Sequence, residues 1–268
     1  MISVVIPTYN RAGKLAECLT TLRYQSLTEG YEVIVVDDGS EDETKRVVTE
    51  LQYPNMTYVN EGHHGPSSAR NAGVRRAHGD VILFMGDDVI ADRNLLQEHA
   101  LFHETHKDCV CLGFTKLDPR LEITYLMRFL GNIGPQFNPE LVRERLDNLP
   151  FYYFMTANIS LKKKAFSDVG FFDETFKEAG GEDIEFGFRL AEAGYRIVFN
   201  EKAKSLNSHF MDVHEFIEYS KRKGESFTLF VRKHEHVLEI ERLIKKPSIG
   251  EGIFLRMFSK PLDRKSVV

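Results

Sequence analysis

EVIVVDDGS, residues 32–40, is a continuous apolar run that ends in two carboxylates. Apolar side chains at consecutive positions are typical of a parallel strand covered on both faces. The pattern recurs in SVVIP (3–7), VILFM (81–85) and CVCLGF (109–114). Segments of helical length separate these runs, at 13–26, 41–51, 67–77 and 92–104. Strands that alternate with helices predict a doubly wound α/β sheet, which binds ligands at the carboxyl ends of its strands.

Two of the predicted helices have recognisable starting residues. Ser40, with Glu43 three residues later, is predicted to cap the second helix, and Asp92 is predicted to cap the fourth. Beyond residue 115 the pattern weakens, because Gly and Pro interrupt 116–150 repeatedly, and an irregular lobe or lid is expected there. After it we expect two further strands, in 151–166 and at YRIVFN (195–200), and a helix over 213–245.

The composition is that of a soluble globular protein. The chain has 268 residues, 42% hydrophobic and 28% charged, and no apolar run approaches the roughly 18 to 20 residues that span a bilayer. MISVVIPTYN enters a strand without a basic leader, so a cytoplasmic location is expected. Cys18, Cys109 and Cys111 lack paired spacing and are interpreted as buried thiols rather than as disulfides or zinc ligands.

The net charge of −5 hides an uneven distribution. Residues 221–268 carry 12 Lys and Arg against 6 Asp and Glu. This basic tail, which contains GIFLRMFSKPL, is either a membrane-surface or polyanion contact or a solvated terminal helix. Its contact with an anionic surface would make the protein peripheral at the inner face of the membrane. No nucleic-acid-binding motif is visible, and no nucleic-acid partner is expected.

Polar residues follow the first two predicted strands directly. After the first comes PTYNR (7–11), in which an aromatic ring can stack on a base and Arg11 can cap a helix or reach a phosphate. After the second comes DDGS (37–40), whose carboxylates can accept hydrogen bonds from a ribose or a base. Each pattern alone is also compatible with a simple turn or helix cap.

Two later motifs carry charge. GPSSARNAG (65–73) opens a helix that presents Arg70, and a helix N-terminus with an adjacent Arg favours a diphosphate. MGDDV (85–89) places Asp87 and Asp88 after a buried strand. Because adjacent carboxylates repel each other, this pair is best explained by a divalent cation that neutralises it.

GGEDIEFGFRL, residues 180–190, sets Glu182 and Asp183 at the head of an amphipathic helix. A carboxylate held there over a cleft can deprotonate an incoming hydroxyl group. Acidic residues also favour the first turn of any helix, where they oppose its dipole. The residues alone leave both interpretations open.

Taken in order, PTYNR, VVDDGS, ARNAG, the double Asp, TANISLKKKAFSDVGFFDE and GGEDIEFGFRL resemble the family 2 glycosyltransferases, which have the GT-A fold. The resemblance covers residues 2 to about 210. It implies an α/β, Rossmann-like, mixed but mostly parallel sheet flanked by helices, with a C-terminal helical extension. It also implies three parts: a nucleotide-sugar-binding half at 1–115, an acceptor-binding half with the Glu-Asp motif at 116–210, and the extension at 211–268.

The resemblance assigns roles residue by residue. The nucleotide-sugar would be held by Pro7, Tyr9, Arg11, Asp38, Arg70 and Asp87. Asp88 would ligate Mn²⁺ or Mg²⁺ bridging the diphosphate, and His209 is either a second ligand or an ordinary core or surface histidine. Asp183 would be the catalytic base. The chain departs from the family pattern at Gly86, where an acidic residue often completes Asp-x-Asp, and at Gly181, where Trp often stands.

The expected function is that of an inverting, metal-dependent glycosyltransferase of the hexosyltransferase type. It would move a sugar from a nucleotide-sugar, expected to be a UDP-sugar, to a carbohydrate, lipid-linked or glycoconjugate acceptor in polysaccharide or glycoconjugate synthesis. One alternative is a non-catalytic nucleotide-sugar-binding domain. The other is a sugar nucleotidyltransferase, which would need a glycine-rich basic loop after the first strand, and PTYNRAGKL lacks one.

Overall fold

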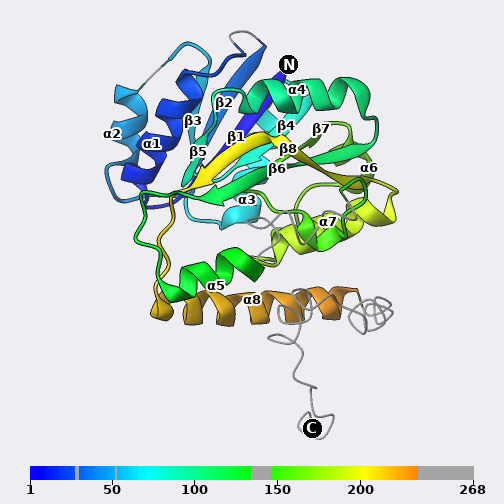
Figure 1. The fold of residues 1–268 in the computed structure, drawn as a ribbon. Helices are drawn as coiled ribbons and strands as arrows, with labels where there is room; N and C mark the ends of the chain where they lie inside the picture. Colours follow the sequence, from blue (N-terminus) through cyan, green and yellow to red (C-terminus); the bar gives the residue numbers. More distant parts are fainter. Residues whose placement is uncertain (28–29, 52, 134–145, 235–268) are drawn as a thin grey trace, which may run out of the picture.

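The computed structural model describes residues 1–27, 30–51, 53–133 and 146–234 (Figure 1). Its strands are β1 (Ile2–Thr8), β2 (Tyr31–Asp37), β3 (Met56–Asn60), β4 (Val81–Met85), β5 (Val89–Ala91), β6 (Cys109–Leu117), β7 (Asn158–Lys162) and β8 (Arg196–Asn207). Its helices are α1 (Ala12–Arg23), α2 (Thr44–Glu50), α3 (Pro66–Arg76), α4 (Leu95–Thr105), α5 (Tyr125–Ile133), α6 (Ala165–Val169), α7 (Glu182–Glu192) and α8 (Val213–Lys233), with a short 3-10 helix η2 (Phe151–Tyr153).

The strands form one mixed sheet in the order β3-β2-β1-β4-β7-β6-β8-β5. β1 to β4 run parallel, β6 pairs parallel with β8, and β7 and β5 run against their neighbours. The start of β7 therefore lies at the same edge as the carboxyl ends of the parallel strands. This sheet, flanked by helices, confirms the predicted α/β, GT-A-type fold.

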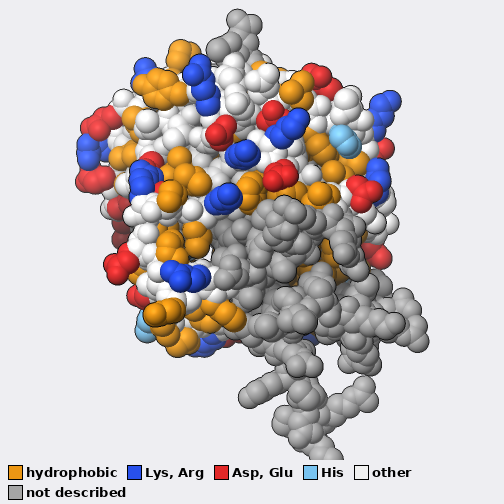
Figure 2. Space-filling view, viewed as in Figure 1, with side chains coloured by type: hydrophobic (Ala, Val, Ile, Leu, Met, Phe, Trp, Pro, Cys, Tyr) orange, Lys and Arg blue, Asp and Glu red, His pale blue; other side chains and the backbone are white. Residues whose placement is uncertain are grey.

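Both faces of the sheet are buried, as the continuous apolar runs predict. Along β1 the side chains alternate, so that Val5 packs in a core with α3, α6 and α7, while Val4 and Ile6 pack in a core with α1 and α4 (Figure 1). Cys18, Cys109 and Cys111 are all buried, as predicted. On the face drawn in Figure 2, basic and acidic side chains are interspersed.

Three local predictions were wrong. Ser40 does not cap α2, because its hydroxyl accepts the N–H of Asn10 and the helix begins only at Thr44. Asp92 does not cap α4, because its carboxylate accepts the N–H of Asn94, the residue at which that helix is capped.

The third concerns 116–150, which contains helix α5 where an irregular lobe was expected. Two strands were not predicted: β3, because its side chains are only partly buried, and β5, because it is only three residues long.

Residues 134–145 and 235–268, including the basic tail and the end of the predicted 213–245 helix, lie outside the described residues. In the described part, no helix is long and apolar enough to cross a bilayer.

Helix α8 packs against the acidic motif. Phe230 on α8 joins Phe176 and Phe188 in a small aromatic core, and α8 runs along the lower side of the molecule in Figure 1. Gly181, which caps α7, lies directly against α8, since a Cβ atom added there would be 2.3 Å from the Cβ atom of Ser226. The backbone before the Glu-Asp pair is thus enclosed by the helical extension.

Candidate active site

The predicted residues gather at one edge of the sheet, where β1, β2 and β4 end and β7 begins. Pro7 lies near the end of β1, opposite Val36 of β2. Tyr9 follows β1, is 42% exposed, and its ring stacks on His63 with the centroids 4.3 Å apart. The two rings form an exposed aromatic surface at the mouth of this edge.

Asp38 lies buried at the same edge, and hydrogen bonds hold its carboxylate in place. Its carboxylate accepts the backbone N–H groups of His64 and Gly65, at 2.8 and 3.0 Å, and His63 Nδ1 lies 3.1 Å from it. Gly65 has φ of +94°, and a Cβ atom there would lie 2.6 Å from the carbonyl oxygen of Lys177. Only glycine fits this close approach between the loop before α3 and the loop before α7.

The two adjacent carboxylates after β4, those of Asp87 and Asp88, both contact the guanidinium of Arg11. Arg11 places its Nη1 atom 3.4 Å from Asp87 and 3.1 Å from Asp88, and Thr8 donates to Asp87 at 2.8 Å. Burial, followed by the charge of Asp88, raises the pKa of Asp87 to about 6, although Arg11 and Thr8 oppose this shift. Arg11 therefore partly compensates a carboxylate pair that desolvation and repulsion destabilise.

Gly86 lies next to the Asp88 carboxylate. A Cβ atom at this position would lie 2.8 Å from Asp88 Oδ1. The Asp88 carboxylate turns toward the end of β8, where Asn207 Nδ2 lies 3.3 Å from its Oδ1.

His209 lies beside Asp88 at the end of β8. Its Nδ1 atom is 4.0 Å from Asp88 Oδ2, and its Nε2 atom is 2.9 Å from Glu215 Oε1. Antiparallel pairing of β5 with β8 fixes this arrangement, because it sets Val89 opposite Asn207. The structure thus places His209 beside Asp88, and whether His209 is a second metal ligand or an ordinary histidine stays a prediction.

Asp183, in the first turn of α7, is held by Thr156. The backbone N–H of Thr156 donates to one carboxylate oxygen at 3.0 Å, and its hydroxyl donates to both at 3.0 and 3.1 Å. Burial, followed by the charge of Glu182, raises the pKa of Asp183, while Arg70 and Thr156 act in the opposite direction. A carboxylate with a raised pKa is a better proton acceptor than a free Asp.

Arg70 pairs with the acidic residues at the start of α7. Its guanidinium is buried and lies 2.9 Å from Glu182 and 3.9 Å from Asp183. Its Nε atom is buried without a hydrogen-bond partner in the described part of the chain. Next to it, Asn71 exchanges two hydrogen bonds with the backbone of Phe172, so α3 also anchors the loop that leads to α7.

A short backbone link joins the two acidic groups. The N–H of Gly86, beside the Asp pair, donates to the carbonyl of Ala157 at 3.2 Å, and Ala157 directly follows the Thr156 that holds Asp183. Asp88 and Asp183 therefore belong to one edge of the sheet and not to opposite sides of the molecule.

The donor set suits a divalent cation that is shared with a phosphate ligand. In the residues that the structure describes, no three His, Cys, Asp or Glu side chains are grouped to hold an ion by themselves. Mg²⁺ is commonly bound by one or two carboxylates together with substrate phosphates. Asp88 supplies a carboxylate of this kind, and an imidazole nitrogen of His209 lies 4.0 Å from it.

Several of these residues were not predicted from the sequence. Thr156 and Thr8 carry no recognisable signal, since a lone Thr beside a strand is unremarkable. Glu215 was detectable in principle, because Asp212 and Glu215 have the spacing of a helix capping box.

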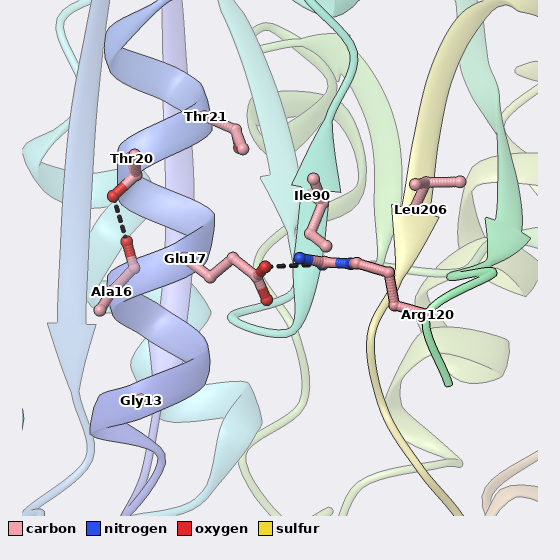
Figure 3. Close-up of a pocket in the computed structure, with 8 residues that line it drawn as sticks. All are labelled: Gly13, Ala16, Glu17, Thr20, Thr21, Ile90, Arg120 and Leu206. Atoms are coloured by element: carbon pink, nitrogen blue, oxygen red, sulfur yellow. Dashed lines mark hydrogen bonds and ion pairs between the residues drawn. The ribbon is translucent and has the colours of Figure 1, made fainter. Parts of the chain in front are cut away.

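A hollow of about 590 Å³ lies elsewhere, beside α1 (Figure 3). Arg120 reaches across to Glu17 at 2.6 Å, as Figure 3 shows. The residues that line this hollow are Gly13, Ala16, Glu17, Thr20, Thr21, Ile90, Arg120 and Leu206. None of the predicted site residues lines this hollow.

Comparison with known proteins agrees with this geometry. The sequence model described as Glycosyl transferase family 2 matches residues 3–170, which include the Asp pair and Thr156. The chain belongs to glycosyl transferase family 2. A second model, Glycosyl transferase family group 2, matches residues 142–224 of this family 2 chain, which include Asp183 and His209.

Curated relatives of this family 2 chain are longer than the chain itself. It is 33% identical over 268 residues to validoxylamine A glucosyltransferase of Streptomyces hygroscopicus subsp. jinggangensis, covering 89% of this chain and 62% of the relative. It is 31% identical over 222 residues to chondroitin synthase of Escherichia coli, covering 72% of this chain and 32% of that protein. The chain thus spans less than two thirds of these relatives.

Solved structures of low sequence identity share the fold of this family 2 chain. Mannosyltransferase PcManGT from Pyrobaculum calidifontis, in complex with GDP-Man and Mn²⁺, matches with a TM-score of 0.67 at 20% identity, over 88% of this chain and 64% of that one. S. aureus TarS 1-349 in complex with UDP-GlcNAc matches with a TM-score of 0.63 at 22% identity, over 96% and 70%.

Proposed function

We propose that the chain transfers a sugar from a nucleotide-sugar, most simply a UDP-sugar, to an acceptor hydroxyl group with inversion at the anomeric carbon. Family membership supports glycosyl transfer, and the observation that carries the proposal is the joining of two acidic groups at one edge through Gly86 and Ala157. Polysaccharide or glycoconjugate synthesis is the expected setting, with a carbohydrate, lipid-linked or glycoconjugate acceptor.

The donor is proposed to lie across the edge formed by β1, β2 and β4. Tyr9, stacked on His63, offers a flat aromatic surface for the base, and Asp38 lies beside it with its carboxylate fixed by two N–H groups. Pro7 and Asp87 are proposed to contact the nucleoside and the ribose or sugar. Arg11 is exposed enough to turn from the Asp pair toward a diphosphate.

Asp88 and His209 are proposed to hold Mn²⁺ or Mg²⁺. When bound, the cation would supply charge neutralisation to the diphosphate that leaves the anomeric carbon. Arg11 would then be released from Asp88, since the cation would take over compensation of that carboxylate. The arrangement would keep the leaving diphosphate beside positive charge from two sources.

Asp183 is proposed to act as the base. Its two oxygens are aligned by Thr156, and burial keeps its pKa above that of a free Asp, so it can take the acceptor proton as the acceptor oxygen attacks from the face opposite the leaving group. Arg70 pairs with Glu182 and so holds the acidic motif, and its additional contact with the nucleotide stays a prediction.

Thermal unfolding with a panel of nucleotide-sugars tests the donor half of the proposal. A UDP-sugar should raise the melting temperature of the wild type only with Mn²⁺ or Mg²⁺, because a ligand stabilises the state that binds it. Asp88→Asn should lose the metal-dependent part of the shift, whereas Glu218→Ala, a control elsewhere on α8, should keep it. A wild-type shift that is equal with EDTA and with Mn²⁺ would rule out the metal requirement.

A further inference from the structure

A carboxylate, an imidazole and a second carboxylate lie in a row at the start of α8. Glu215 Oε1 is 2.9 Å from His209 Nε2, and His209 Nδ1 is 4.0 Å from Asp88 Oδ2. The side chain of His209 is 22% exposed and that of Asp88 is 14% exposed, so both are largely shielded from solvent. Each ring nitrogen of His209 thus faces a different acidic residue.

The backbone holds two members of this row in place. The N–H and the hydroxyl of Ser208 both donate to the carbonyl of Asp88, at 2.9 and 3.0 Å. The N–H of His209 donates to the side chain of Asn207 at 3.0 Å. These contacts hold the backbone and do not fix the rotation of the imidazole ring, whose Nε2 atom lies 2.9 Å from Glu215 Oε1.

The position of Glu215 has an ordinary explanation that its contact does not follow. Asp212 caps α8 by accepting the N–H of Glu215 at 2.8 Å, and the acidic residue three positions after the cap in such a capping box usually turns its own carboxylate back toward the cap. Here that carboxylate makes an ion-pair contact with His209 instead, 2.9 Å from its Nε2 atom. An acidic first turn would suit the helix dipole equally well without this contact.

We infer that Glu215 is a positioning residue for the metal site, orienting His209 so that Nδ1 presents its lone pair beside Asp88. The negative charge of a carboxylate beside Nε2 favours the neutral tautomer that carries its proton on Nε2, in which the Nδ1 lone pair can coordinate a cation. The inference rests on the proposed function, because it takes Asp88 and His209 as the ligands. It also gives α8 a part in donor binding, since its first turn completes the site.

The test measures Mn²⁺ binding to the full chain in the presence of UDP, by the electron paramagnetic resonance signal of free Mn²⁺. Glu215→Ala should weaken binding about 10- to 100-fold, the range seen when such an orienting partner is removed. His209→Ala should weaken it at least as much. The double variant should lose little more than His209→Ala alone, because the two residues act through one ligand.

Conservative and matched variants separate positioning from a structural role. Glu215→Gln keeps the side-chain length and an amide oxygen whose partial negative charge can face Nε2–H, so it should recover part of the affinity that Glu215→Ala loses. Glu218→Ala removes the same charge from the next turn and should bind Mn²⁺ like the wild type. Melting temperatures without metal test the alternative that Glu215→Ala weakens α8. In that case Glu215→Ala would lower the melting temperature without a selective loss of Mn²⁺ affinity.

Two failures can be told apart. If His209→Ala weakens Mn²⁺ binding and Glu215→Ala binds like Glu218→Ala, the role of Glu215 is refuted and the metal site stands. If the wild type with UDP binds no Mn²⁺, the metal requirement of the proposed function fails, and the inference about Glu215 fails with it.

Discussion

Thr156 donates to Asp183 both from its backbone N–H, at 3.0 Å, and from its hydroxyl, at 3.0 and 3.1 Å. The backbone bond places the carboxylate relative to β7, and the hydroxyl bond stabilises its ionised form. Because Ala157 bonds to Gly86, the same short segment also sets the position of the Asp pair. Changes at Thr156 should therefore act first on the proposed base.

Thr156→Val removes the hydroxyl but keeps the shape and the backbone N–H. Since the lost bond favours the ionised carboxylate, the pKa of Asp183 should rise further and the acidic limb of the rate profile should move to higher pH. At high pH, where the base is ionised in both proteins, the rates should differ less. Thr156→Ser should leave the profile unchanged, and an unshifted profile in Thr156→Val would contradict the contact's role.

A buried histidine pair lies behind this segment. His99 bonds to Ser160 and Asn158, each at 2.8 Å, and His103 bonds to Ser160 at 2.8 Å. Burial lowers the pKa of His99 to about 4 and that of His103 to about 3. The unfolded chain takes up these protons near pH 6.5, so the unfolded state binds more protons between pH 6.5 and pH 4.

The free energy of unfolding should therefore be highest above pH 6.5 and should fall as the pH decreases toward 4. Urea unfolding at pH 7.5, 6 and 5 measures this slope. The His99→Gln/His103→Gln variant should be less stable at pH 7.5 but should lose less stability between pH 7.5 and 5. An equal slope in the variant and the wild type would show that other groups cause the acid sensitivity.

Gly181→Ala should destabilise the contact between α7 and α8. The added methyl group would lie 2.3 Å from the Cβ atom of Ser226, and overpacking of this kind costs about 1–3 kcal/mol. Ser226→Gly in the same chain should restore part of that loss. Gly224→Ala is the matched control, because a Cβ atom there meets nothing within 4 Å, and alanine in a helix is as stable or more stable. Melting temperatures of the wild type and the three variants test this, and a Gly181→Ala protein as stable as Gly224→Ala would contradict the close contact.

Arg11→Met should strengthen Mn²⁺ binding in the absence of nucleotide. The Arg11 guanidinium lies 3.1 Å from Asp88 and competes there with a divalent cation, so its removal should increase affinity severalfold. With UDP present the gain should shrink or reverse, because the proposed diphosphate contact is lost. Titration calorimetry with and without UDP measures both, and a weaker affinity for Mn²⁺ alone would contradict the competition.

The sequence predicts the fold well where local pattern and burial coincide. Val33 to Val36 are fully buried, so an apolar run alone identifies β2. Ser40 shows the opposite case, because a distant backbone group, the N–H of Asn10, takes the hydroxyl that the capping pattern reserved for α2. Hydrogen bonds between segments 30 residues apart have no local signal.

The candidate site, like the fold, contains residues that the sequence indicates and residues that it does not. Asp88 and Asp183 stand out because each belongs to a pair of adjacent acidic residues, one just after a buried strand and one directly after two glycines. Their partners do not, since Thr156 and Glu215 are ordinary residues until the sheet places them beside an acid or an imidazole. Arg70 was expected near a diphosphate, and no sequence pattern indicated that it pairs with Glu182.

The most direct test of the account compares donor binding and sugar transfer in Asp183→Asn. The variant should keep the Mn²⁺-dependent rise in melting temperature with the donor, because Asp183 is not among the proposed donor contacts. Its rate of sugar transfer from that donor should fall about 100- to 10,000-fold. Donor binding with wild-type turnover would contradict the assignment of Asp183 as the base.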